Sequence, residues 1–356
     1  MTLTTAQQAA LQYVRQHARG RKKRAVEEID SVLIMSNIER PLFTRAMTQL
    51  KEKARVALHF HPDRMGPDGK TVARALAKSG VYRSQFETLI SNGSVSAHAG
   101  GARDLWEQRL FGGSYTFENS TPAHRPKYGA LDLLGHADGP SPRFGSCYFL
   151  LKPAVKERCS FSYMDSHNDT VEKGTIDEFD DIMAALLVEV YTRNYGLGEH
   201  DLSVLKLIQR LAKGFEGKGE ARRNLNHYIE AQIHGEVSLK DDVEILVADP
   251  SFKGTDTEQY LDIISTNFGV KLHWHQGFSM LADKVPDDFK GPTMPSLAKR
   301  LAGPEGRIDA NRIGLGALSL QNDPASWRDR GDIKEVLQEF KLLWHVLVKY
   351  GEPYKG

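Results

Sequence analysis

Residues 56–64, VALHFHPDR, decide the fold of this chain. Successive side chains of a β-strand point to opposite faces, so Val56, Leu58 and Phe60 share one face and positions 57, 59, 61 and 63 share the other. The first face is apolar and suits a core. The second carries two imidazoles and a carboxylate. A strand of this kind is typical of the border of a cleft, and the sequence predicts one here.

The composition is that of a globular protein. The chain has 356 residues, 40% of them hydrophobic and 26% charged, which is enough for one large domain or two ordinary ones. The net charge of +1 gives no global attraction to nucleic acid or to membranes, and we expect neither as a partner. The first residues, MTLTT, lack the layout of a secretory signal peptide. Two cysteines, Cys147 and Cys159, suit a reducing compartment.

Helices and strands are predicted along most of the chain. Residues 1–55 have the spacing of two or three amphipathic helices, with a break at the basic run GRKKR (20–24), which is either a solvated connection or a contact for a phosphate or acidic partner. Further helices are expected over 71–78, 103–111, 177–212 and most of 255–350, and strands over 147–151, 159–163, 243–247 and 271–275. Residues 112–145 lack periodicity, and we predict an irregular functional segment there.

A second strand with chemistry on one face is predicted at YIEAQIHG, residues 228–235. Alternation places Ile229, Ala231 and Ile233 on an apolar face and Glu230 on the opposite one. A carboxylate in the middle of a buried strand is costly unless it faces a cleft or has a partner. Glu230 is therefore a candidate functional residue.

Two interpretations of HFHPDR rest on short motifs. His59, His61 and Asp63 have the residue types and the alternate-strand spacing of a metal-dependent hydrolase site, but further ligands with a second paired motif are not evident. His61-Pro62-Asp63 after a basic segment is also the tripeptide of J-domain co-chaperones, although the helix expected after it there is not matched by residues 71–80. We predict no metal site and keep both interpretations as alternatives.

A third interpretation covers more of the chain. LHFHPDR (58–64), followed by a short helix closing on Gly80, resembles the opening of PARP-like ADP-ribosyltransferases, and YGAL (128–131) is similar to their tyrosine-bearing element that stacks on nicotinamide. The motifs HFHPDR, YRSQFET, RPKYGAL, GSCYFLL and YIEAQIHG resemble, over roughly residues 50–350, the family of CteC-type bacterial effectors. Those enzymes use NAD to ADP-ribosylate a threonine of ubiquitin, which blocks ubiquitination.

The resemblance implies a site. It makes Glu230 and Asp63 a catalytic carboxylate pair around a ribose, and it makes NAD the substrate that supplies the ADP-ribosyl group. The implied cofactor-binding residues are His61, Arg64, Tyr82, Arg83, Ser91, Asn92, Gly93 and Tyr128. The chain departs from the classical pattern at Asp63, where those enzymes place an arginine or a histidine. Arg83 is the alternative source of that arginine.

The resemblance further implies an α+β fold with a split, mostly antiparallel sheet. The expected parts are an N-terminal helical region (1–55), a transferase core (56–166 and 221–275), a helical insertion that recognises the target (167–220) and a C-terminal helical region (276–356). We expect a monomeric transferase that modifies a protein hydroxyl, with ubiquitin as the first acceptor. Its expected location is the bacterial cytoplasm before export and, for an exported effector, the host cytosol. The rivals are the metal-dependent hydrolase and a J-domain-like adaptor.

Overall fold

Strand β1 (Arg55–Phe60) lies inside an eight-stranded sheet in this computed structural model, which describes residues 2–89, 97–116, 120–215 and 219–354. Across the sheet the order is β12 (Lys271–Trp274), β11 (Val243–Ala248), β4 (Cys147–Leu151), β1, β3 (Lys127–Asp132), β9 (Ile229–Ile233), β5 (Cys159–Tyr163) and β6 (Lys173–Thr175). All neighbours in it are antiparallel except β11 and β12, which are parallel. The expected mostly antiparallel α+β organisation is confirmed.

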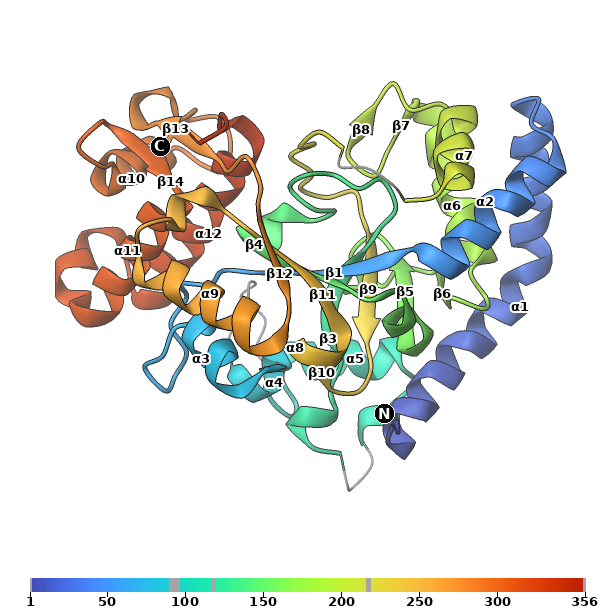
Figure 1. The fold of residues 1–356 in the computed structure, drawn as a ribbon, viewed down its shortest axis with the longest axis horizontal. Helices are drawn as coiled ribbons and strands as arrows, with labels where there is room; N and C mark the ends of the chain where they lie inside the picture. Colours follow the sequence, from blue (N-terminus) through green and yellow to red (C-terminus); the bar gives the residue numbers. More distant parts are fainter. Residues whose placement is uncertain (1, 90–96, 117–119, 216–218, 355–356) are drawn as a thin grey trace.

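The two faces of β1 differ as its alternation predicts. Val56, Leu58 and Phe60 join the main hydrophobic core, while Ala57 and His59 face the other side. Four helices cover the end of the sheet near β6, namely α1 (Thr5–Met35), α2 (Arg40–Lys53), α6 (Asp180–Arg193) and α7 (Val204–Lys213) (Figure 1). Their apolar stripes bury the core face of the sheet, which is the main favourable term in folding.

Helix α1 runs without interruption through the basic residues 20–24, so the predicted break is wrong. The physical reason lies across the helix interface, where acidic residues around the start of α6 meet the basic ones. Arg21 pairs with Asp181 at 2.8 Å, and both Arg19 and Lys22 pair with Glu178. Acidic groups at a helix N-terminus also favour its dipole. The basic cluster therefore binds an acidic helix start within the same chain.

Segment 167–220 is less purely helical than the sequence suggests. Besides α6 and α7 it contains β6, which forms the edge of the sheet, and a small hairpin of β7 (Tyr195–Gly196) and β8 (Glu199–His200). Its apolar helix residues lie in the main core. This segment is thus part of the structural framework of the sheet.

Several of the remaining elements add residues, such as Leu76 and Leu261, to the same hydrophobic core. Strands β2 (Val81–Tyr82) and β10 (Val237–Ser238) form a separate two-stranded sheet. Five helices accompany it, namely α3 (Val72–Ser79), α4 (Gln85–Thr88), α5 (Ala102–Leu110), α8 (Leu239–Asp242) and α9 (Asp256–Phe268). The C-terminal region comprises β13 (Ser279–Leu281), α10 (Met294–Leu301), β14 (Arg307–Asp309), α11 (Ala310–Asn322) and α12 (Ile333–Tyr350), and it gathers beside α9 (Figure 1). Short 3-10 turns, such as η3 (Pro142–Phe144) and η5 (Ser166–Asn168), connect the larger elements. Within the described ranges, no helix combines the length and apolarity needed to cross a membrane.

The sheet opens between its two central strands. Strand β1 pairs with β3 over only Arg55 to Ala57, and beyond that point its remaining residues pair with β4 alone. Gly129 of β3 lies at the divergence, where a Cβ would come within 2.4 Å of the Ala57 carbonyl oxygen. Glycine is therefore required for the close approach that precedes the opening. Residues 112–145, expected to be irregular, supply this central strand β3.

Candidate functional site

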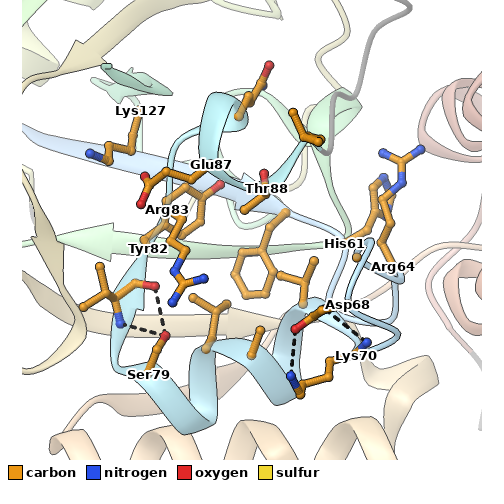
Figure 2. A pocket seen from close by; sticks show the side chains of 18 of the residues that line it. His61, Arg64, Asp68, Lys70, Ser79, Tyr82, Arg83, Glu87, Thr88 and Lys127 are labelled. Atoms are coloured by element: carbon orange, nitrogen blue, oxygen red, sulfur yellow. Dashed lines mark hydrogen bonds and ion pairs between the residues drawn. The ribbon is translucent and has the colours of Figure 1, made fainter. Parts of the chain in front are cut away.

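A cavity of about 310 Å³ extends from this opening toward α3 and α4 (Figure 2). Five residues implied by the resemblance line it, namely His61, Arg64, Tyr82, Arg83 and Tyr128. Figure 2 shows the first two on one side of the cavity and Lys127, Glu87 and Arg83 on the other. The other three implied residues, Ser91, Asn92 and Gly93, lie outside the described residues.

The floor of this first cavity is apolar and its rim is charged. Phe60, Val72 and Leu76 form part of the floor. At the rim, Lys70 pairs with Asp68 at 2.8 Å. Glu87, a carboxylate in the middle of the YRSQFET motif, accepts a hydrogen bond from the Ser84 backbone N–H at 2.8 Å in a capping box. Its carboxylate therefore stabilises the start of α4.

A second cavity, of about 250 Å³, adjoins the first and contains Glu230. Both cavities are lined by His59, Tyr82, Gln85 and Tyr128. Glu230 lies in the middle of β9, opposite Ala130 of β3, and its side chain is 5% exposed. The predicted alternation of this strand is confirmed, because Ile229, Ala231 and Ile233 all belong to the core on the other face.

The carboxylate of Glu230 is held by two donors. Its Oε1 accepts a hydrogen bond from the Ser166 hydroxyl and another, of 2.9 Å, from the Gln232 amide. Burial, followed by the negative charge of Asp165, raises its pKa to about 8. Those two effects outweigh the hydrogen bonds, which favour the charged form. The cavity thus holds a carboxyl group whose pKa lies well above that of an ordinary glutamate.

Asp165 is a second carboxylate lining the same cavity, and the sequence interpretation missed it. It follows the end of β5, the neighbour of β9, so the pairing of Tyr163 with Ile229 brings it beside Glu230. The Tyr228 hydroxyl donates to it at 3.1 Å and the His167 backbone N–H at 3.0 Å. The sequence did show that Asp165 follows a predicted strand by two residues. Nothing in the sequence identified that strand, β5, as the neighbour of β9.

A layer of buried polar side chains lies behind Glu230. Gln232 accepts from the Ser160 hydroxyl at 2.8 Å, and that hydroxyl is 3.0 Å from His234 Nε2. The other ring nitrogen of His234 is 2.6 Å from the Tyr115 hydroxyl. Burial lowers the pKa of His234 to about 3, so the ring is neutral. A connected network of this kind fixes the rotamer of Gln232 and hence the donor that it offers to Glu230.

An ion network holds Tyr128 in the wall of the second cavity. Its hydroxyl donates to Glu107 Oε1 at 2.7 Å, and its ring packs 5.4 Å from that of Trp106. Glu107 in turn pairs with Arg125 at 3.0 Å, and the same guanidinium binds Asp104. Because Glu107 is fully buried, its charge requires these partners. The aromatic wall therefore rests on α5.

Asp63 does not line the cavity of Glu230. Strand β1 ends at Phe60, and Asp63 turns toward α11, where its carboxylate packs against Gly314 in a cavity of about 50 Å³. Its Oδ2 is buried with no hydrogen-bond partner among the described residues. Burial raises the pKa of Asp63 to about 7. The expected pairing of Asp63 with Glu230 is thus not formed. The second carboxylate in the cavity of Glu230 is Asp165.

The two rival interpretations of HFHPDR find little support in the geometry. Both ring nitrogens of His59 are engaged, Nδ1 with the Gly145 carbonyl at 3.2 Å and Nε2 with the Ser141 N–H at 3.4 Å. In the described part of the chain, no three His, Cys, Asp or Glu side chains are grouped as metal ligands. His61-Pro62-Asp63 lies between a strand and a helix, whereas a J-domain places this tripeptide between two helices.

Comparison with known proteins gives one family match. The model of a family described as protein of unknown function, DUF3626, matches residues 55–350. The chain belongs to the DUF3626 family. The matched range begins with β1 and ends with the last residue of α12, so the DUF3626 unit contains the whole sheet and all the cavities described above, while α1 and α2 lie outside it. A search of curated proteins finds no match to the chain.

Proposed function

We propose that this protein is an NAD-dependent mono-ADP-ribosyltransferase that modifies a hydroxyl side chain of a protein, with a threonine of ubiquitin as the first acceptor to test. The observation that carries the proposal is Glu230. It is a buried mid-strand carboxyl group with a pKa near neutral, and it faces a cavity lined by Tyr82 and Tyr128. Four of the motifs on which the expectation rested, HFHPDR, YRSQFET, RPKYGAL and YIEAQIHG, contribute residues to two adjoining cavities.

The proposed fold is the split sheet of the ADP-ribosyltransferases. Its support is the divergence of β1 from β3 after only three residue pairs, with both cavities beginning at that point. Cavities of about 310 and 250 Å³ that share four lining residues offer the elongated space that a dinucleotide requires.

The chemistry requires a carboxylate beside the nicotinamide ribose. As the bond between C1′ and the nicotinamide nitrogen breaks, positive charge develops at C1′, and the nicotinamide leaves with the electron pair of that bond. Glu230 stabilises this charge when it is ionised, and a preorganised charge of this kind is worth several kcal/mol in a dry site. The developing positive charge in turn favours the ionised form of Glu230. Tyr128, fixed by Glu107, provides a flat face for the nicotinamide ring.

The acceptor requires a base. In the proposed reaction the acceptor oxygen forms a bond to C1′ and its proton passes to a carboxylate. Asp165 is suited to this role because it lines the cavity of Glu230 and is oriented by Tyr228 and His167. Two carboxyl groups in one cavity, with one of them strongly perturbed, are the pattern from which acid and base roles are assigned.

The direct test uses purified protein, labelled NAD and a panel of acceptor proteins that includes ubiquitin. We expect label on a protein hydroxyl, with transfer reduced about 10²–10³-fold by Glu230→Gln, which keeps the shape and removes the charge. Asp165→Asn should reduce transfer more than it reduces hydrolysis of NAD by water. The matched control is Glu236→Gln, an exposed glutamate shortly after the same strand. Transfer that survives Glu230→Gln, or a wild-type protein that neither cleaves NAD nor labels any acceptor, would overturn the proposal.

A further inference from the structure

Basic side chains from three separate segments meet where the cavities adjoin. Arg143 of η3 and Lys341 of α12 both line the cavity of Glu230 and the small cavity beside Asp63. Arg64, after β1, lines that small cavity and the large one. The small cavity therefore meets the first cavity at Arg64 and the cavity of Glu230 at Arg143 and Lys341. Only Arg64 was expected in the site from the sequence, because Arg143 and Lys341 are far from it and from each other along the chain.

These cations are close enough to disfavour one another. The pKa of Lys341 is lowered by its partial burial, then by Arg143 and Arg64. Lys290, whose pKa is lowered by burial and by Arg143, adds a fourth positive charge. Behind them, His345 of α12 is neutral, because burial and Arg143 hold its pKa at about 2. Like charges kept together in a partly dry site raise the free energy of the folded protein unless an anion joins them.

For Arg143 and Lys341, the described residues do not supply that anion. Arg143 donates to the Asn226 side chain at 2.9 Å, but its Nε is buried without a hydrogen-bond partner, and neither Arg143 nor Lys341 forms an ion pair with a described carboxylate. The nearest acidic groups that act on the cluster are Asp165, near Lys341, and Asp63, near Arg64. Asp63 has a pKa of about 7 and Glu230 one of about 8, so at neutral pH the acidic side chains carry less charge than their number suggests.

Contacts between the segments hold the basic side chains in fixed positions. The indole N–H of Trp344 donates to the carbonyl oxygen of Pro142 at 2.8 Å, which ties α12 to η3. Because Arg143 follows Pro142 and Lys341 lies one helical turn before Trp344, this bond sets the separation of the two cations. His61 packs edge-on against the same indole at 5.2 Å and brings in the end of β1.

We infer that Arg143, Lys341 and Arg64 form a subsite for a diphosphate, placed so that the C-terminal helix α12 closes over the middle of the bound dinucleotide. The inference rests on the proposed function and deepens it, because a diphosphate is the one strongly anionic part of NAD. Guanidinium and ammonium groups bind phosphate oxygens through charge-assisted hydrogen bonds. The C-terminal helical region is thereby part of the ligand site, a role that the sequence did not suggest.

The test is a binding measurement that needs no catalysis. Calorimetry of the full chain with ADP-ribose, inorganic pyrophosphate, adenosine and nicotinamide riboside separates phosphate recognition from recognition of the two nucleosides. We expect Lys341→Met and Arg143→Met each to weaken ADP-ribose and pyrophosphate about tenfold, the effect of one charge-assisted hydrogen bond. Neither change should weaken nicotinamide riboside, whose pyridinium ring is itself a cation, and added salt should weaken both phosphate ligands. The matched control is Lys334→Ala, an exposed lysine on the same helix.

The possible results distinguish a failure of the diphosphate subsite from a failure of the proposed transferase activity. Pyrophosphate and ADP-ribose that bind the two methionine variants as tightly as the wild type would overturn the subsite, as would a wild-type protein that binds neither. If one variant does not fold, the other gives the answer. Pyrophosphate binding that depends on Lys341 in a protein that never cleaves NAD would keep the subsite and refute the transferase. If both variants cleave NAD as fast as the wild type, the transferase would be supported and the subsite refuted.

Discussion

Two buried carboxyl groups near the cleft, Glu230 and Asp63, have similar pKa shifts and very different surroundings. Glu230 accepts hydrogen bonds from Ser166 and Gln232, and a further layer of polar side chains orients the second of these donors. Asp63 packs against Gly314 and leaves one oxygen without a partner among the described residues. Burial alone therefore does not distinguish the proposed catalytic carboxylate from Asp63. The distinguishing feature is whether the surrounding side chains position it.

The largest expected difference between the two carboxylates is in activity. Glu230→Gln should lower ADP-ribosyl transfer about 10²–10³-fold, because it removes the charge that faces C1′. Asp63→Asn, which keeps the shape of the side chain, should change transfer by less than about threefold, since its carboxylate faces α11. Transfer rates of both purified variants with labelled NAD measure this. An equal loss in both would show that Asp63 reaches the reacting atoms and would erase the comparison.

The next effect concerns the support of the Glu230 cavity. Arg125→Met leaves Glu107 and Asp104 buried without their cation, so it should lower the free energy of unfolding by about 3–5 kcal/mol. The control is Arg109→Met on α5, the helix that carries Glu107 and Asp104. Its pair with Asp169 is largely exposed and should be worth about 0–1 kcal/mol. Urea unfolding of both variants gives the comparison, and similar losses would mean that the network does not stabilise the wall.

Gly314→Ala tests the surroundings of Asp63. A Cβ at this position would lie 1.5 Å from Asp63 Oδ2, so the substitution should destabilise the protein by about 1–3 kcal/mol through overpacking. In an Asp63→Ala background the clash is absent, and alanine should then stabilise α11 by up to about 1 kcal/mol, as expected inside a helix. A double-mutant cycle by denaturant unfolding measures this reversal of sign. If the effects of Gly314→Ala and Asp63→Ala on the free energy of unfolding are additive, the Asp63 side chain does not contact Gly314.

A further effect is on stability as a function of pH. Glu230 has a pKa of about 8 in the folded protein against 4.5 for an ordinary glutamate, so the folded state binds the extra proton between those values. The stability linked to this proton is complete below about pH 4.5 and is lost as the pH rises through 8. Glu230→Gln should therefore gain melting temperature relative to the wild type between pH 6 and 9. A difference that does not vary with pH would show that the carboxyl group is not perturbed.

The sequence predicted the strands better than it predicted their neighbours. Alternation alone placed Glu230 opposite the core residues of β9 and His59 on the cleft side of β1, because the side-chain period of a strand is local. The pairing of β5 with β9, which brings Asp165 to Glu230, depends on the tertiary arrangement. No local pattern contains that information. For the same reason the sequence could not bring Arg143 and Lys341 together.

Two errors have identifiable physical causes. The basic run of α1 was expected to break the helix, but its partners, Glu178 and Asp181, lie far along the chain and stabilise it there. Asp63 was expected beside Glu230 by extending the alternation of β1 past Phe60, where the strand ends. Pro62 has no N–H to offer a neighbouring strand, and this feature of the motif was a local reason to expect the end.

The bond from Trp344 to Pro142 has a consequence for the order of events in synthesis. Helix α12 is the last wall of the cleft, and the strands that it covers are made long before it. A nascent chain can assemble much of the sheet while residues 333–350 are still inside the ribosome, yet the cleft then lacks one side. The proposed diphosphate subsite therefore forms only after α12 has been synthesised and has docked on η3, which is later than the synthesis of the strands.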